Sequence, residues 1–167
     1  MQHERFMKIA ITQARQALDA GEFPVGCVIA DGRKVVATGT RQGTAGNRFN
    51  ETGHAEMVAL GKLDRSGVSD AQDGLVLYST LEPCLMCFGA AMIHGVAHIV
   101  YGYEDVMGGG TSCDLSCLPP LYSNRRISIT PGVMRKECLE LFRRYFKNPA
   151  NRYLKDTLLA KHALSGV

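Results

Sequence analysis

Short apolar runs that alternate with stretches of helical period constrain this chain more than any other feature of its sequence. Three predominantly apolar runs, residues 25–30, 75–78 and 97–101, are typical of buried strands. A helical pattern between the last two runs begins at Pro83 and ends at Gly95. Strands that alternate with helices require crossover connections, so the strands in this part of the chain are expected to be parallel.

An antiparallel hairpin is expected to precede this alternating region. Asp31-Gly32 is a tight-turn pair that joins the first apolar run to a return strand at 35–37. A short strand is expected at 127–129, and residues 40–53 lack any period and predict a loop. Helices are predicted over residues 4–20, 54–63, 83–95, 130–147 and, more weakly, 152–163. The predicted fold is an α/β three-layer α/β/α sandwich with a mixed sheet of about five strands.

The length of 167 residues predicts one domain. We assign residues 1–147 to this domain and residues 148–167 to a C-terminal helical extension. No apolar run approaches the roughly 20 residues that cross a bilayer, and residues 1–5 lack the pattern of a signal peptide. We therefore expect a cytoplasmic protein without a membrane partner.

Six cysteines raise the question of disulfides or metal ligands. Because export is not predicted, thiols that lie close together are better interpreted as metal ligands or core residues. Cys27 lies in an apolar run and Cys138 on a helical face, and both are expected in the core. Cys113 and Cys117 have no convincing partners for a second metal site, which leaves them structural or incidental roles.

Two short motifs, His54-Ala55-Glu56 and Pro83–Cys87, each stand at the start of a predicted helix. Cys84 and Cys87 are three residues apart, so both thiols face one side of the first helical turn. The positive end of the helix lowers the pKa of such thiols. Two thiolates and one neutral imidazole, that of His54, fill three of the four tetrahedral positions of a zinc ion.

The fourth position distinguishes a structural zinc site from a catalytic one. A catalytic site keeps it for a water molecule, whose pKa zinc lowers to about 7. Glu56 is poorly placed to share a metal with His54 but well placed to hydrogen-bond this water, which predicts a proton shuttle. The backbone N–H groups of Ala55 and Cys84, at the two helix starts, are expected to stabilise charge nearby.

In these residues the chain resembles the cytidine/deoxycytidylate deaminase superfamily, whose signature is H-x-E followed by P-C-x-x-C. The stretch Thr80–Cys87, with Gly89-Ala90, His94 and the flanking segments 22–26 and 129–135, is most similar to bacterial tRNA-specific adenosine deaminases. The resemblance covers roughly residues 4–146. It implies Zn²⁺, hydrolytic loss of ammonia from C6 of adenine or C4 of cytosine, and a homodimer.

The resemblance also implies the walls of a base pocket. Phe23 and Val25 are expected to line it, with Ala55 beside them. The family holds its base with an Asn just after the second strand, where this chain has Thr40-Arg41-Gln42-Gly43. Asn47 and Asn50 are the candidates to replace that Asn. Glu104-Asp105, after a strand, is a further candidate for substrate contact.

Three functions remain open from the sequence. The first is conversion of adenosine to inosine in tRNA, which the Thr80–Cys87 match favours. The basic C-terminal quarter also favours RNA, because it has ten Lys/Arg against three Asp/Glu from Arg125 onward. The second function is deamination of a free base or nucleoside, such as guanine or cytosine, which the altered 40–43 stretch favours. The third is a non-catalytic zinc-binding partner subunit, against which the retained Glu56 argues.

Overall fold

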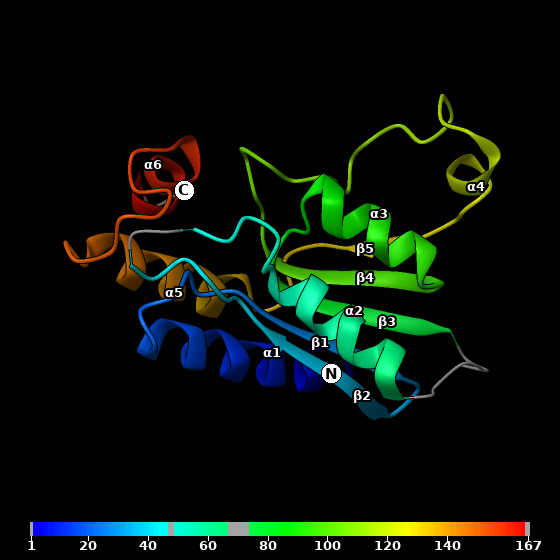
Figure 1. Ribbon diagram of the computed structural model, residues 1–167, viewed down its shortest axis with the longest axis horizontal. Coiled ribbons are helices and arrows are strands. Elements are labelled where there is room, and N and C mark those ends of the chain that lie inside the picture. Colours follow the sequence, from blue (N-terminus) through cyan, green and yellow to red (C-terminus); the bar gives the residue numbers. More distant parts are fainter. Residues whose placement is uncertain (1, 47–48, 67–73, 166–167) are drawn as a thin grey trace.

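A single mixed sheet forms the centre of the computed structural model, which describes residues 2–46, 49–66 and 74–165 (Figure 1). The five strands lie in the order β2-β1-β3-β4-β5. β1 is antiparallel to both β2 and β3, whereas β3, β4 and β5 are parallel. The prediction of a mixed sheet of about five strands is confirmed. The strands are β1 (Gly26–Asp31), β2 (Lys34–Thr40), β3 (Leu75–Leu81), β4 (Val96–Tyr103) and β5 (Ser128–Thr130).

Helices cover both faces of the sheet and complete the three predicted layers (Figure 1). α1 packs on β1 and β3, and α5 packs beside it on β4; α2 packs on β2 and β1 and contacts α3. Among the described residues, none of the helices is long and apolar enough to cross a membrane. The helices are α1 (Gln2–Asp19), α2 (Ala55–Ser66), α3 (Leu85–Ile93), α4 (Pro120–Ser123), α5 (Arg135–Lys147) and α6 (Leu158–Ser165).

Two predicted helix starts were wrong, and α4 was not predicted. α5 begins at Arg135 and not at residue 130, because the backbone N–H of Val133 bonds to the Tyr101 carbonyl of β4 and Met134 is left-handed (φ 54°). α6 begins at Leu158 and not at residue 152. Leu154 is left-handed there (φ 57°), which interrupts a helix of L-residues.

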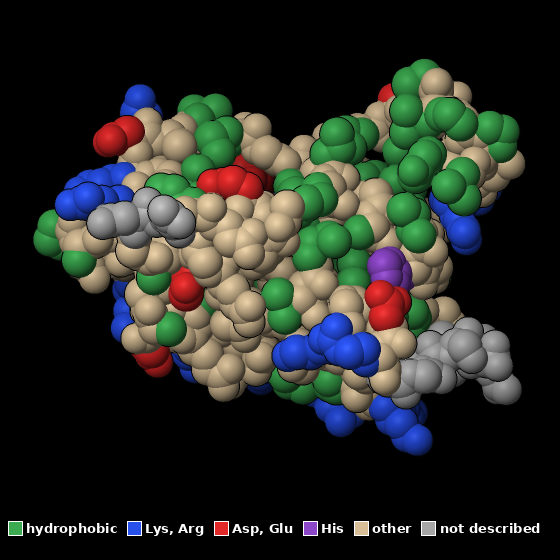
Figure 2. All heavy atoms as spheres, viewed as in Figure 1, with side chains coloured by type: hydrophobic (Ala, Val, Ile, Leu, Met, Phe, Trp, Pro, Cys, Tyr) green, Lys and Arg blue, Asp and Glu red, His purple; other side chains and the backbone are tan. Residues whose placement is uncertain are grey.

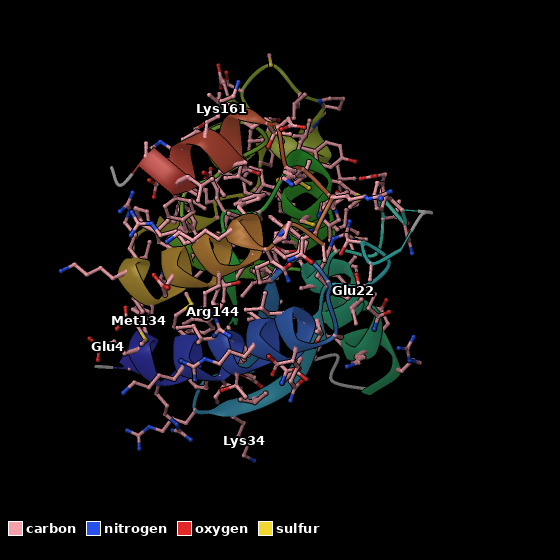
Figure 3. All side chains as sticks on the ribbon, turned by 90° about the vertical axis from the view of Figure 1, so that its left-hand side faces the viewer. Glu4, Glu22, Lys34, Met134, Arg144 and Lys161 are labelled. Carbon is pink, nitrogen blue, oxygen red and sulfur yellow. The ribbon has the colours of Figure 1, made fainter. Side chains whose placement is uncertain are left out.

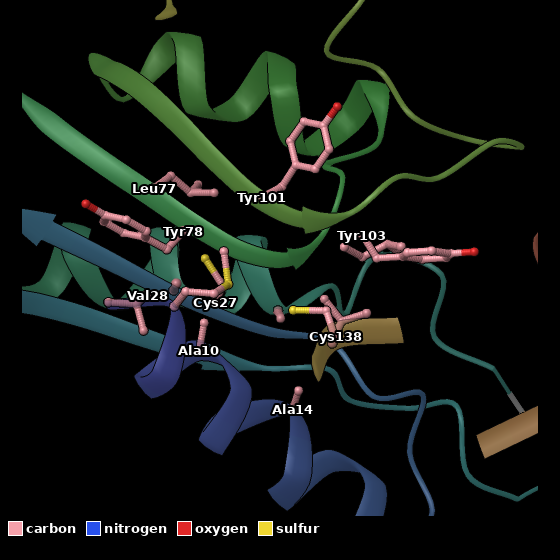
Figure 4. Packing of buried hydrophobic residues seen from close by; sticks show 14 of the residues in the cluster. Ala10, Ala14, Cys27, Val28, Leu77, Tyr78, Tyr101, Tyr103 and Cys138 are labelled. Atoms are coloured by element: carbon pink, nitrogen blue, oxygen red, sulfur yellow. The ribbon is translucent and has the colours of Figure 1, made fainter. Parts of the chain in front are cut away.

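A glycine in β2 brings the start of α2 close to the sheet. A Cβ atom on Gly39 would lie 1.8 Å from the carbonyl oxygen of Ala55, so only glycine fits beneath this helix. On the opposite face, a Cβ atom on Gly26 of β1 would lie 2.1 Å from the carbonyl oxygen of Ala10 in α1, and Figure 4 shows Ala10 and Ala14 on this helix. Small side chains at these contacts let both helices approach the sheet closely.

The two cysteines that we expect in the core are indeed there. Cys27 and Cys138 are both fully buried, and Figure 4 shows them within the apolar cluster. The same cluster includes residues beyond position 147. Tyr153, Leu159, Ala160 and Ala163 are all buried in it, so the C-terminal residues share the core of the main domain.

Candidate active site

His54, Cys84 and Cys87 form the one group among the described residues that could hold a metal ion, with ligand atoms all within 4.8 Å of one another. The Nδ1 atom of His54 lies 3.6 Å from Sγ of Cys84 and 3.5 Å from Sγ of Cys87. Zinc bonds of ordinary length at a tetrahedral angle would place a nitrogen and a sulfur ligand about 3.6 Å apart. The three ligands therefore fit zinc without rearrangement.

Two neighbouring helix starts position these ligands. The His54 carbonyl accepts the first helical hydrogen bond of α2, from Val58 N–H, and the Cys84 carbonyl accepts that of α3, from Phe88 N–H. Cys84 is the N-cap residue of α3, but its side chain makes no capping hydrogen bond. Its thiol is thus free to face the metal position while the helix dipole favours its thiolate.

The electrostatics of the metal-free cluster favour one thiolate. A hydrogen bond from the Cys87 thiol lowers the pKa of Cys84 to about 4, and the bond to His54 adds to this effect. The same hydrogen bond to Cys84, together with burial, raises the pKa of Cys87. The hydrogen bond to Cys84 raises the pKa of His54. A bound metal ion takes the place of these shared protons.

Glu56 lies on the first turn of α2 and is only 3% exposed. Its Oε1 atom accepts a hydrogen bond of 2.7 Å from the Ser79 hydroxyl of β3, and its Oε2 atom lies 3.7 Å from the Cys87 sulfur. Burial raises the pKa of this carboxyl. One oxygen is therefore fixed by the sheet while the other faces the metal ligands.

A cavity of about 410 Å³, including the open solvent at its mouth, lies over His54, Cys84 and Glu56. Its walls combine apolar and aromatic side chains with one cation and two further carboxyl groups. The residues that line it are Phe23, Val25, Arg41, His54, Glu56, Leu81, Glu82, Cys84, Asp105, Tyr153 and Leu154.

The structure brings some of the predicted substrate residues to this cavity but not others. Phe23 and Val25 line it, as predicted. Ala55 is buried, and its side chain is not among the lining residues. Asn50 is exposed, and its Oδ1 accepts hydrogen bonds from Thr52 and Gly53 within its own turn. Asn47 lies outside the described residues.

Several residues of the site were not predicted from the sequence, among them the lining residues Leu81, Glu82 and Leu154. Arg41 and Tyr153 line the cavity, and Ser79 holds Glu56 from below. The polar pair Ser79-Thr80 after an apolar run was the available signal for Ser79. No sequence pattern links Arg41 to Tyr153, which are 112 residues apart.

The two acidic residues in the cavity wall hold the neighbouring loop. Glu82 accepts hydrogen bonds from the backbone of Asp105 and from Thr111, and Asp105 accepts two from the backbone of Met107 and Gly108. Both carboxylates thus have partners within the protein. Glu104, the other candidate after β4, pairs instead with Arg135 and His162.

His94 and His98 have polar partners within the fold, and Cys113 and Cys117 lie outside the metal group. His94 pairs with Asp64 at 3.1 Å, and His98 shares a hydrogen bond of 2.8 Å with Thr130. Cys113 and Cys117 are exposed free thiols, and among the described residues neither belongs to a group that could hold a metal.

Comparison with known proteins supports this geometry. The model of the cytidine and deoxycytidylate deaminase zinc-binding region matches residues 1–103. A tRNA-specific adenosine deaminase of Bacillus subtilis is 30% identical over 146 residues, which cover 87% of this chain and 89% of that protein.

Solved structures give the same result for the fold. An enzyme of A-to-I editing at the wobble position of transfer RNA is 27% identical, with a TM-score of 0.67 over 82% of this chain and 98% of that one. A guanine deaminase from Nitrosomonas europaea has the same TM-score at 22% identity, over 85% of this chain and 83% of that chain. At this identity the second likeness concerns the fold alone.

Proposed function

This chain belongs to the cytidine and deoxycytidylate deaminase family and is a zinc-dependent hydrolytic deaminase, and from this premise we propose that it converts adenosine in tRNA to inosine. The observation that carries the chemistry is the zinc-compatible spacing of His54, Cys84 and Cys87 beside a buried carboxylate. The relative from Bacillus subtilis and the structure of a tRNA-editing enzyme support the substrate.

The residues of the site have separate tasks in this reaction. His54, Cys84 and Cys87 hold the zinc, which when bound lowers the pKa of water enough to supply a nucleophile near neutral pH. Glu56 accepts the proton of the attacking water on the oxygen that Ser79 leaves free. It then donates that proton to the ring nitrogen beside the reacting carbon. Glu56 next takes the proton of the newly attached hydroxyl group and passes it to the amino group, which leaves as ammonia while the carbonyl forms. Water and the aminated base thus become the oxo-base and ammonia.

Exposed basic residues near the cavity support a polyanionic substrate. Arg152 and Lys155 flank the two lining residues Tyr153 and Leu154 in sequence and are both exposed. Arg144 of α5 and Lys161 of α6 are also exposed, on the face shown in Figure 3. If these side chains contact the phosphates of a nucleic acid, they release its counterions on binding, so the affinity should fall steeply as the salt concentration rises. A tRNA substrate also fits the cytoplasmic location that we predict from the sequence.

The direct test is incubation of the purified protein with a set of tRNA transcripts, followed by measurement of inosine by mass spectrometry. We expect inosine with the wild type and none with Glu56→Ala. Arg152→Ala with Lys155→Ala should raise the KM for tRNA, whereas Lys34→Ala at the distant β-hairpin should not. Absence of inosine in every tRNA would refute the tRNA proposal.

One observation favours a second substrate class, a free base or nucleoside. The stretch 40–43 lacks the Asn that the resemblance implies there, and Arg41 of this stretch is buried in the cavity wall. Release of ammonia from a panel of free bases and nucleosides tests this alternative. Activity on a small molecule without activity on any tRNA would establish it in place of the first proposal.

We also propose that the protein is a homodimer, formed through α3 and the region of α4. Several large apolar side chains in these regions are exposed, and Figure 2 shows apolar side chains gathered on this part of the surface. They are Leu85, Met86, Ile93, Val106, Met107, Leu118 and Leu121. Sedimentation equilibrium should give a dimer that Ile93→Lys with Leu121→Lys converts to a monomer. A monomeric wild type at micromolar concentration would contradict this proposal.

A further inference from the structure

The C-terminal segment (residues 148–157), which joins α5 to α6, forms part of the cavity wall. Tyr153 and Leu154 lie among the residues around the metal ligands, and Tyr153 is only 7% exposed. Leu154 adopts the left-handed backbone conformation, which is costly for a residue with a side chain. This segment, shown in orange, runs beside residues 41–46 and 49–53 of the loop after β2, shown in cyan (Figure 1).

Tyr153 fastens this segment to that loop. Its hydroxyl donates a hydrogen bond of 2.8 Å to Glu51 and accepts one of 3.2 Å from Arg41. Its ring packs edge-on against Phe23 on one side and Phe49 on the other. The ring is therefore held against the loop that follows β2, and it fastens the C-terminal segment there.

Arg41 is the most deeply buried charged residue of the cavity wall, at 2% exposed. Its guanidinium donates to the carbonyl oxygens of Gln42 and Asn50, both at 2.9 Å, and to the Tyr153 hydroxyl. In the part of the chain that the structure describes, these partners are all neutral and use three of its five N–H groups. Among the described residues, the carboxylate of Glu51 reaches it only through Tyr153.

A buried cation with spare donors favours a ligand that brings hydrogen-bond acceptors. The carboxylates of Glu82 and Asp105, also in the wall, already accept hydrogen bonds from the adjacent loop. An arginine donates and never accepts, so it can recognise only a carbonyl oxygen or an unprotonated ring nitrogen. Arg41 is thus suited to the edge of a base that carries no amino group.

We propose that Arg41 determines which base this deaminase accepts, by hydrogen-bonding the acceptor edge of the ring, and that Tyr153 of the C-terminal segment is its positioning residue. The proposal rests on the proposed deaminase function. It gives the C-terminal segment a part in substrate selection. It also predicts that the reacting amino group lies at one edge of the base and that hydrogen-bond acceptors lie at another edge.

The test measures kcat and KM of wild type, Arg41→Met, Arg41→Lys and Tyr153→Phe on a panel of substrates. The panel holds a tRNA, adenosine, guanine and cytosine, with the 3-deaza and 7-deaza analogues of any purine that reacts. Arg143→Met is the matched arginine control, because Arg143 also tethers the C-terminal region, through the Ala163 carbonyl. Tyr103→Phe is the matched tyrosine control, because its buried hydroxyl has no hydrogen-bond partner among the described residues.

We expect Arg41→Met to lower kcat/KM for the best substrate by roughly 10- to 100-fold, mainly through KM, and to change the ranking of the bases. Arg41→Lys should lower kcat/KM by a smaller factor, because lysine keeps the positive charge but cannot form the two parallel hydrogen bonds of a guanidinium. Tyr153→Phe should shift the ranking in the same direction by a smaller factor. If the substrate is a purine, one of its deaza analogues should react more slowly than the parent purine with the wild type. With Arg41→Met, that analogue and the parent purine should react equally well.

Zinc content and circular dichroism identify any variant that fails to fold, in which case Arg41→Lys and Tyr153→Phe decide. Folded, zinc-loaded variants that keep the wild-type ranking and KM would overturn the proposal while leaving the deaminase function intact. A wild type that releases no ammonia from any substrate would instead refute the proposed function. Equilibrium dialysis of the same bases would then decide the Arg41 proposal, since equal affinity of wild type and Arg41→Met would overturn it.

Discussion

The two sides of the cavity are built in different ways. The zinc side, made of His54, Glu56, Cys84 and Cys87, lies on two rigid helix starts, and its members are two or three residues apart within each motif. The outer side, made of Arg41, Tyr153 and Leu154, joins a loop to a segment more than a hundred residues further along.

This difference separates reaction type from substrate choice. Helix starts offer fixed backbone donors and fixed side-chain directions, which a metal site and a proton shuttle require. Loops and chain extensions can change sequence while that scaffold stays the same. We therefore expect changes on the zinc side to abolish the reaction, and changes on the outer side to alter which base reacts.

The largest effect is expected from Cys87→Ala, which removes a buried zinc ligand. Two remaining ligands should hold zinc weakly, so both the zinc content and the deaminase activity should fall to background. Zinc is measured by atomic emission on the purified variant. Cys113→Ser, at an exposed thiol outside the metal group, is the control and should keep both. A fully zinc-loaded Cys87→Ala would contradict the assigned ligand set.

Glu56→Gln should lower kcat by about 10²- to 10⁴-fold while zinc stays bound, because a neutral amide cannot carry the proton. The KM should change little, since the side chain keeps its size. Activity and zinc content measured on one preparation separate this effect from that of the ligand variant. Glu140→Gln, an exposed change on α5, is the control. Near wild-type turnover in Glu56→Gln would exclude this residue as the proton shuttle.

Ser79→Ala should lower kcat by about 10-fold with little change in KM, because Glu56 loses the hydrogen bond that fixes one of its oxygens. Thr80→Val provides a matched control on the same strand. The Thr80 hydroxyl is equally buried but accepts from the backbone N–H of Gly26, far from the carboxylate. If both variants lost kcat alike, the effect would reflect strand packing and not the position of Glu56.

The grouping of the three metal ligands could be predicted from the sequence, and the reason is physical. A helix places residues three apart on one face, so Cys84 and Cys87 could be grouped without knowledge of the fold. The strands were equally accessible, because buried strands require apolar runs such as 25–30 and 75–78.

The outer side could not be predicted, because its contacts depend on tertiary structure. Arg41 and Tyr153 meet only after the sheet, α5 and the left-handed turn at Leu154 have formed. The late start of α5 has a similar cause. Residues 131–134 suit a helix, but Val133 instead bonds to the β4 carbonyl of Tyr101, and no local pattern reveals that choice.

The smallest effect is expected from Glu104→Gln, which tests how the outer side is anchored. Glu104 joins Arg135 of α5 to His162 of α6, and the hydrogen bond from Arg135, with that from His162, lowers its pKa to about 2. Because the folded-state pKa lies below the ordinary value of 4.5, this carboxylate stabilises the fold above pH 4.5 and loses that contribution as the pH falls toward 2.

Since a third of its side chain is exposed, we expect Glu104→Gln to reduce the free energy of unfolding at pH 7 by only about 1 kcal/mol. Urea denaturation should show this difference at pH 7 and a smaller one near pH 3. The ranking of bases should not change, because Glu104 does not line the cavity. A change of ranking as large as that in Arg41→Met would mean that the placement of the whole C-terminal region, and not one guanidinium, selects the base.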